Sequence, residues 1–120
     1  MANTFKLKTK ASVSNSALEA VYTVPNDTTT IVIGCTLSNI SSAAITADVQ
    51  VATTVLSGQS DHDDDVYVVK TAPVPAGGSL EVMAGNKLVL QSDSDSGDVL
   101  KAKSSAASAL DVVLTIMEIT

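Results

Sequence analysis

The stretch Ile45-Thr46-Ala47-Asp48-Val49-Gln50-Val51 decides the fold class of this chain. Its apolar residues occupy every second position, with Thr46, Asp48 and Gln50 between them. Because successive side chains of a β-strand point to opposite faces, this alternation predicts a strand with one buried face and one polar face. We expect that strand to lie within Ala44 to Leu56.

About nine short apolar runs of this kind recur along the 120 residues, each closed by a turn signal such as Pro25-Asn26-Asp27. The connections are too short for crossover helices, so we expect antiparallel pairing. The sequence therefore predicts an all-β protein, an antiparallel β-sandwich of the jelly-roll or Greek-key type with about 8–9 strands. The runs outside Ala44 to Leu56 cover residues 5–8, 18–24, 28–37, 66–72, 79–83, 87–91, 99–103 and 110–119.

The content of these runs predicts their places in the sheets. Thr28 to Leu37 is β-branched and nearly continuous, which favours a central strand covered on both sides. Leu110 to Ile119 is also expected to be central, whereas Pro73 and Pro75 exclude a central strand around them. We divide the chain into residues 1–17, an N-terminal arm with an edge strand and a loop, and residues 18–120, a single β-sandwich domain.

The composition describes an aliphatic, acidic protein. Hydrophobic residues make up 45% of the chain but aromatic residues only 2%, so the core must consist of Val, Ile, Leu and Ala. A thin aliphatic sandwich gains stability by burying further surface against a partner, which favours a homo-oligomer. The net charge is −6, and all seven basic residues are lysines. This balance argues against nucleic acid and anionic membrane as partners.

The sequence offers no set of catalytic residues. Cys35 lies inside an apolar run and is interpreted as a buried structural thiol. His62 is the single histidine, and no Gly-x-Ser-x-Gly motif or phosphate-binding glycine motif occurs. We therefore expect a protein that is not an enzyme and has no cofactor. The first residues lack the apolar stretch of a signal peptide, which predicts synthesis in a cytoplasm.

Two acidic segments are the candidates for metal binding. Asp61, Asp63, Asp64 and Asp65 crowd one predicted loop, and Asp93 to Asp98 alternates serine with aspartate. Carboxylate oxygens suit Ca²⁺, but neither segment has the spacing of a known calcium loop. The favoured interpretation is a pair of solvated loops. The alternative hypothesis is a calcium-dependent carbohydrate-binding module that uses both segments.

The N-terminal arm is the predicted partner-binding element. Phe5 is flanked by Lys6, Lys8 and Lys10, and these three lysines leave a charge of −9 for the rest of the chain, from four lysines and 13 acidic residues. A basic, partly apolar strand on an acidic body is suited to dock on a neighbour's acidic surface or to add to its sheet edge. The alternative is an ordinary solvated first strand.

Several segments resemble one family of small virion proteins from tailed bacteriophages, including marine phages and cyanophages. The resemblance runs from about residue 18 to the end of the chain, and its motifs are signatures of turns and strands. The segments that carry it are Val21-Tyr22-Thr23-Val24-Pro25, Thr28-Thr29-Thr30-Ile31-Val32-Ile33-Gly34, Leu37-Ser38-Asn39, Val74-Pro75-Ala76-Gly77-Gly78-Ser79-Leu80-Glu81, Gly85-Asn86-Lys87-Leu88-Val89-Leu90 and Gly97-Asp98-Val99-Leu100-Lys101.

This resemblance implies a β-sandwich structural protein located in the virion. The expected role is that of a capsid decoration or cement protein, which binds the outer shell and stabilises it. Its expected partners are the major capsid protein or other virion proteins, and a trimer is the favoured assembly. The alternative within the virion is an adaptor associated with the tail, neck or fibre.

Overall fold

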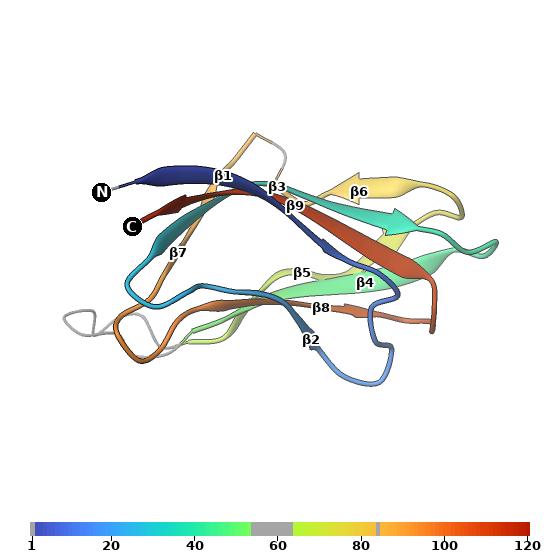
Figure 1. Cartoon of the computed structure of the whole chain (residues 1–120). Coiled ribbons are helices and arrows are strands. Elements are labelled where there is room, and N and C mark those ends of the chain that lie inside the picture. The colour runs from blue at the N-terminus through green and yellow to red at the C-terminus, as the bar shows by residue number, and fades with distance from the viewer. Residues whose placement is uncertain (1, 54–63, 84) are drawn as a thin grey trace.

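The computed structural model describes residues 2–53, 64–83 and 85–120. They form two antiparallel sheets that pack face to face, and the polypeptide ends lie beside each other (Figure 1). Ala2 and Thr120 exchange two backbone hydrogen bonds, at 3.2 and 3.0 Å. The strands are β1 (Asn3–Lys10), β2 (Glu19–Thr23), β3 (Thr29–Asn39), β4 (Ile45–Ala52), β5 (Val66–Val74), β6 (Ser79–Glu81), β7 (Leu88–Gln91), β8 (Val99–Ser104) and β9 (Leu110–Ile119).

The strand order is that of a jelly roll. One sheet, here called sheet A, has the order β1-β9-β3-β6, with β7 also paired to β3; the other, sheet B, has the order β2-β8-β4-β5. Since β6 and β7 pair with successive parts of β3, they act as one interrupted strand. If β6 and β7 are counted as one strand, the chain has eight strands. Sheet A then holds the first, eighth, third and sixth of them, in that order, which is the arrangement of a jelly roll. The predicted fold class is confirmed.

The side chain of Glu81 occupies the interruption between β6 and β7. Its carboxylate accepts hydrogen bonds from the backbone N–H groups of Cys35 and Met83, both at 2.9 Å, and from the Thr36 hydroxyl at 2.8 Å. Burial raises the pKa of Glu81, but these donors outweigh that effect, so its pKa lies below the ordinary value. The carboxylate therefore replaces ladder hydrogen bonds that a continuous strand would make.

The core lies between the sheets and is aliphatic, as the composition predicts. The alternation of Ile45, Ala47, Val49 and Val51 is confirmed, because all four are buried. The largest fully buried side chains are mostly leucines and valines, together with Ile116. Close packing of such side chains supplies most of the stability of a domain of this size.

Most predicted strand positions are confirmed, and one is wrong in part. β3 and β9 are central, and β5, which contains Pro73, is an edge strand. β3 is not covered on both sides, however. Its inward residues are buried, whereas its outward residues, such as Ile31 and Thr36, are only half-buried. Within the described residues, no second layer packs on the outward face of β3. The prediction of burial on both sides was wrong because a strand rich in β-branched residues can still have one face open to solvent.

Candidate functional site

β1 divides the four residues of the predicted partner-binding arm between two faces. Phe5 lies opposite Met117 on the outward face of sheet A. Lys6, Lys8 and Lys10 lie beside inward positions of β9, at the side of the sandwich where β1 approaches β2. The strand period of two thus separates the aromatic ring from the charges. Whether the four residues bind a partner stays a prediction, but they do not form one continuous surface.

Lys6 takes part in a polar network that links the two sheets. Its Nζ lies 2.7 Å from Oε1 of Glu118, whose side chain is 7% exposed. The Tyr22 hydroxyl donates to Oε2 of Glu118 at 2.6 Å and lies 2.8 Å from the Thr30 hydroxyl. β1, β9 and β3 belong to sheet A and β2 to sheet B, so this network, here called the Glu118 clamp, joins four strands.

The pKa values of the Glu118 clamp reflect its burial. Burial alone would raise the pKa of Glu118. The hydrogen bonds from Lys6 and Tyr22, together with the charge of the nearby Lys8, lower the pKa by more than burial raises it, so it lies below its ordinary value of 4.5. Burial and the hydrogen bond to Glu118 raise the pKa of Tyr22, which keeps the phenol protonated. The clamp therefore holds one ionised carboxylate and one neutral phenol.

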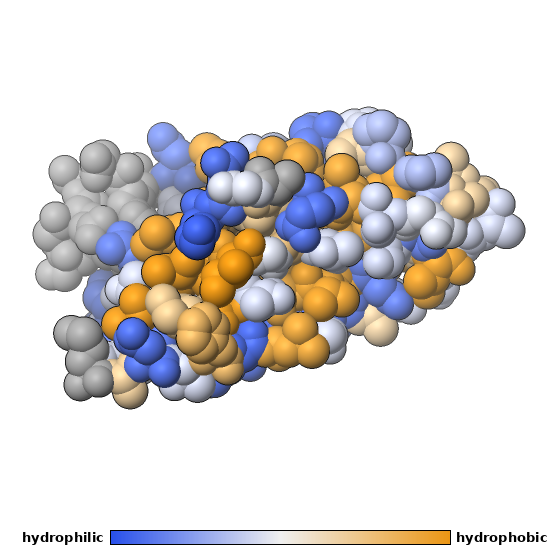
Figure 2. All heavy atoms as spheres, turned by 90° about the horizontal axis from the view of Figure 1, so that it is seen from above, coloured by the Kyte–Doolittle hydropathy of each residue, from blue (hydrophilic) through white to orange (hydrophobic). Residues whose placement is uncertain are grey.

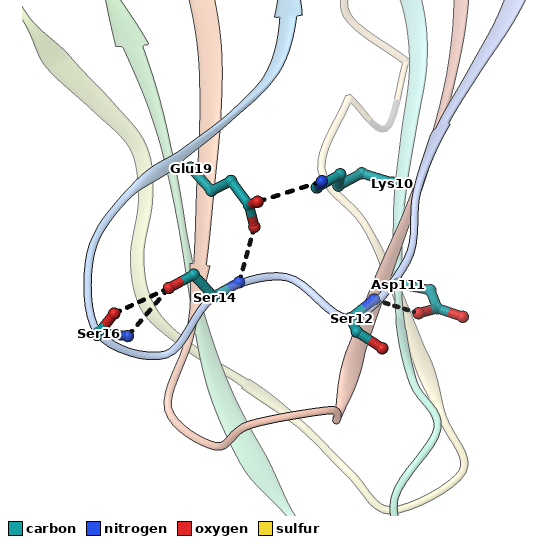
Figure 3. A network of polar contacts seen from close by, with 6 residues as sticks. All are labelled: Lys10, Ser12, Ser14, Ser16, Glu19 and Asp111. Atoms are coloured by element: carbon teal, nitrogen blue, oxygen red, sulfur yellow. Dashed lines mark hydrogen bonds and ion pairs between the residues drawn. The ribbon is translucent and has the colours of Figure 1, made fainter.

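Lys10 pairs with a carboxylate that also binds the connection between β1 and β2 (Figure 3). Its Nζ lies 3.2 Å from Oε2 of Glu19, while Oε1 of Glu19 accepts the backbone N–H of Ser14 at 2.9 Å. The backbone N–H of Ser12 donates to Oδ1 of Asp111 at 2.9 Å. Two carboxylates, one from β2 and one from β9, thus bind backbone N–H groups in the first half of the connection. Two of the three arm lysines thus form ion pairs within the chain itself.

The outward face of sheet A carries a row of apolar side chains that cross four strands. The register places Phe5, Met117, Ile31 and Val89 side by side on β1, β9, β3 and β7. Phe5 is 70% exposed and Val89 is 53% exposed. We call this row, together with Leu7 and Val113, the outer apolar patch. Figure 2 looks on this face and shows hydrophobic side chains gathered toward the end where the termini lie.

The sequence predicted only Phe5 of the outer apolar patch. The other members lie on strands that are far apart in the chain, and only the register between strands brings them together. Val113 and Met117 carried a usable signal, because they alternate with the buried residues of β9 and must point away from the core. Contiguous exposed apolar side chains of this kind commonly mark a surface where another molecule binds.

The acidic segments were the other predicted sites. Asp61, His62 and Asp63 lie outside the described residues. Of their neighbours, Asp65 accepts the backbone N–H of Thr53 through Oδ1 at 2.9 Å, and the carbonyl oxygen of Asp64 accepts the Thr53 hydroxyl at 2.7 Å. Within residues 2–53, 64–83 and 85–120, no group of three or more His, Cys, Asp and Glu side chains is arranged to hold a metal ion.

The segment Asp93 to Asp98 uses its carboxylates for local structure. Oδ1 of Asp93 accepts the backbone N–H groups of Asp95 and Ser96 at 2.8 and 2.7 Å, which closes a tight turn. Oδ2 of Asp98 accepts the backbone N–H of Gln91 at 2.9 Å. These bonds hold the connection between β7 and β8. Binding of Ca²⁺ to either acidic segment stays an untested alternative hypothesis.

Cys35 is fully buried in the core, in agreement with the interpretation of a structural thiol. Burial, together with the nearby charge of Glu81, raises the pKa of the thiol to about 12. Because the thiolate is the reactive form, we expect less than one tenth of the protein to react with a thiol-specific disulfide reagent at pH 8 within an hour. Addition of denaturant should make the reaction complete within minutes. Rapid reaction of the folded protein would contradict this placement of Cys35.

The described part of the chain contains no pocket and no helix long and apolar enough to cross a membrane. No protein-family model and no curated protein matches this chain.

Proposed function

We propose that this protein is a non-enzymatic structural protein that works by binding to other proteins through sheet A. The observation that carries the proposal is the outer apolar patch, with Phe5 70% and Leu7 66% exposed on a well-packed jelly roll. Burying an aliphatic or aromatic side chain at an interface contributes about 1.5–3 kcal/mol. Of the six side chains in the patch, Phe5, Leu7, Val89 and Val113 are exposed enough to be buried by such a contact.

The sequence resemblance supports a location in the virion of a tailed phage, synthesised in the host cytoplasm. In this proposal the protein is a decoration or cement protein that binds the major capsid protein on the outer shell. A shell repeats the same surface many times, so a moderate affinity for each copy suffices to stabilise the lattice. A trimer is the favoured assembly, and sedimentation equilibrium of the purified protein would measure it.

The test is the composition of purified particles. Virions are isolated on a density gradient from a lysate of the phage that encodes this chain, and the copy number is measured by quantitative mass spectrometry against the major capsid protein. Hundreds of copies per particle would support decoration of the capsid, and a dozen or fewer would support the tail, neck or fibre alternative. Complete absence from infectious particles would overturn the proposal.

A further inference from the structure

The free edge of β1 offers backbone groups for a further strand. β1 pairs with β9 along its full length, and no described strand pairs with its other side. Ala2 and Thr120 form a hydrogen-bonded pair, and such pairs alternate with non-hydrogen-bonded pairs along an antiparallel ladder. The unbroken register therefore directs the N–H and C=O groups of Asn3, Phe5, Leu7 and Thr9 away from β9. These four residues line the open edge.

The other edges in the described part of the chain are short or interrupted. β2 has five residues and an irregular register with β8 between Ala20 and Tyr22. β5 has two register shifts, a Thr71 with a φ of 55°, and Pro73. β6 and β7 have three and four residues. Proteins commonly use such irregularities to prevent pairing at an edge, whereas β1 has eight regular residues and no proline.

The charges beside this edge indicate what kind of strand fits it. Lys6, Lys8 and Lys10 lie on the inward face of β1, and Phe5 and Leu7 lie on its outward face. Two copies paired through β1 with their outward faces on the same side would set lysine opposite lysine, which is destabilising. If one copy were turned over, the lysines of one strand would lie opposite Phe5 or Leu7 of the other, and neither lysine nor apolar side chain would gain a complementary neighbour. The pattern instead complements a strand with acidic residues on one face and apolar residues on the other.

We propose that the free edge of β1 binds an extended segment of a partner protein, with acidic and apolar residues in alternation, as an added strand of sheet A. The acidic side chains lie on the face of β1 that carries Lys8, because within the described residues Lys6 and Lys10 already pair with Glu118 and Glu19. The apolar side chains extend the outer apolar patch beside Phe5 and Leu7. Main-chain hydrogen bonds supply affinity, and the alternating side chains supply specificity. This inference rests on the proposed function, since it names the chemistry of the partner segment.

The first test uses peptides and amide hydrogen exchange measured by NMR. The probe is a nine-residue peptide of alternating valine and glutamate, and the matched controls are alternating valine and lysine and a shuffled valine–glutamate sequence. We expect the amides of Phe5, Leu7 and Thr9 to exchange at least tenfold more slowly with the first peptide only. A Lys8→Gln variant should bind that peptide about two- to fivefold more weakly. Equal protection by all three peptides, or none by the first, overturns the proposal.

The second test separates the backbone of β1 from its side chains. Leu7→Pro removes an N–H that points to the open edge, so the ladder with β9 keeps its hydrogen bonds but a new strand is excluded. Leu7→Ala removes the side chain and keeps the N–H. We expect Leu7→Pro to bind the peptide at least tenfold more weakly than Leu7→Ala does. Equal binding by both variants contradicts strand addition.

The same pair of variants distinguishes this inference from the proposed function. If wild type and Leu7→Pro attach equally to purified particles, the edge inference fails and the virion role stands. If the peptide binds β1 but the wild-type protein is absent from particles, the virion role fails. The edge of β1 is then a binding site for a partner outside the virion. If Leu7→Pro does not fold, the peptide exchange experiment on the wild-type protein decides alone.

Discussion

Lys6→Met is expected to lower the free energy of unfolding by about 2–3 kcal/mol. The substitution keeps most of the apolar stem of Lys6 but leaves Glu118, 7% exposed, without the ammonium group that lies 2.7 Å away. A buried charge that loses its partner destabilises a protein by several kcal/mol, and the 42% exposure of Lys6 reduces this because water reaches that side. Urea denaturation followed by circular dichroism measures the change.

Lys10→Met is the matched control for this prediction. Lys10 lies on the same strand and the same face, but the side chain of its partner Glu19 is 34% exposed, against 7% for Glu118. Surface pairs of this kind contribute little, so we expect almost no change in the urea midpoint. Equal destabilisation by the two substitutions would show that loss of a lysine from β1, and not loss of the Glu118 clamp, causes the effect.

The pH dependence gives a second measure of the same clamp. The pKa of Glu118 is lower in the folded chain than its ordinary value of 4.5, so the unfolded chain binds more protons in this range. The contribution of the clamp is therefore fully present above about pH 5 and is lost as the pH falls through the folded-state pKa. The pKa values of Asp48 and Glu81 are also lowered, so their contributions to folding stability fall with pH as well. That loss is the same in the wild-type protein and in Lys6→Met, and it cancels when the two are compared. The difference between wild type and Lys6→Met should thus shrink toward about pH 3.

The double substitution Phe5→Ser and Val89→Ser is expected to reduce attachment to purified particles by more than tenfold. Both side chains belong to one cross-strand row of the outer apolar patch and are 70% and 53% exposed. Each substitution removes a side chain whose full burial contributes about 1.5–3 kcal/mol, and a repeated lattice multiplies the loss. Co-sedimentation of the purified protein with particles stripped of it measures the occupancy.

The control for this prediction removes two exposed apolar side chains elsewhere on the surface. Ile40→Ser with Val66→Ser changes two side chains that are 55% and 53% exposed, at the turn after β3 and on β5. Both double variants should fold with thermal midpoints within a few degrees of wild type, because exposed substitutions change stability little. If both pairs weaken attachment equally, general surface hydrophobicity explains the binding and the patch has no special role.

The acidic segments show where prediction from the sequence stopped. Their composition indicated carboxylates in loops, and this is confirmed for Asp64, Asp65, Asp93 and Asp95. The same composition could not show that Asp93 and Asp98 use their oxygens to bind backbone N–H groups. Hydrogen-bond partners depend on how a turn closes, and residue types alone do not determine that.

The sequence by itself determined the strands, the aliphatic core and the antiparallel sandwich. These features follow from a period of two residues and from turn signals, which act between neighbours in the chain. Only the tertiary structure decided that Lys6 pairs with Glu118 and that Phe5 lies beside Met117, across sequence distances of more than a hundred residues. Such neighbours are set by the register between distant strands, and a shift of one residue would exchange the inward and outward faces of β1.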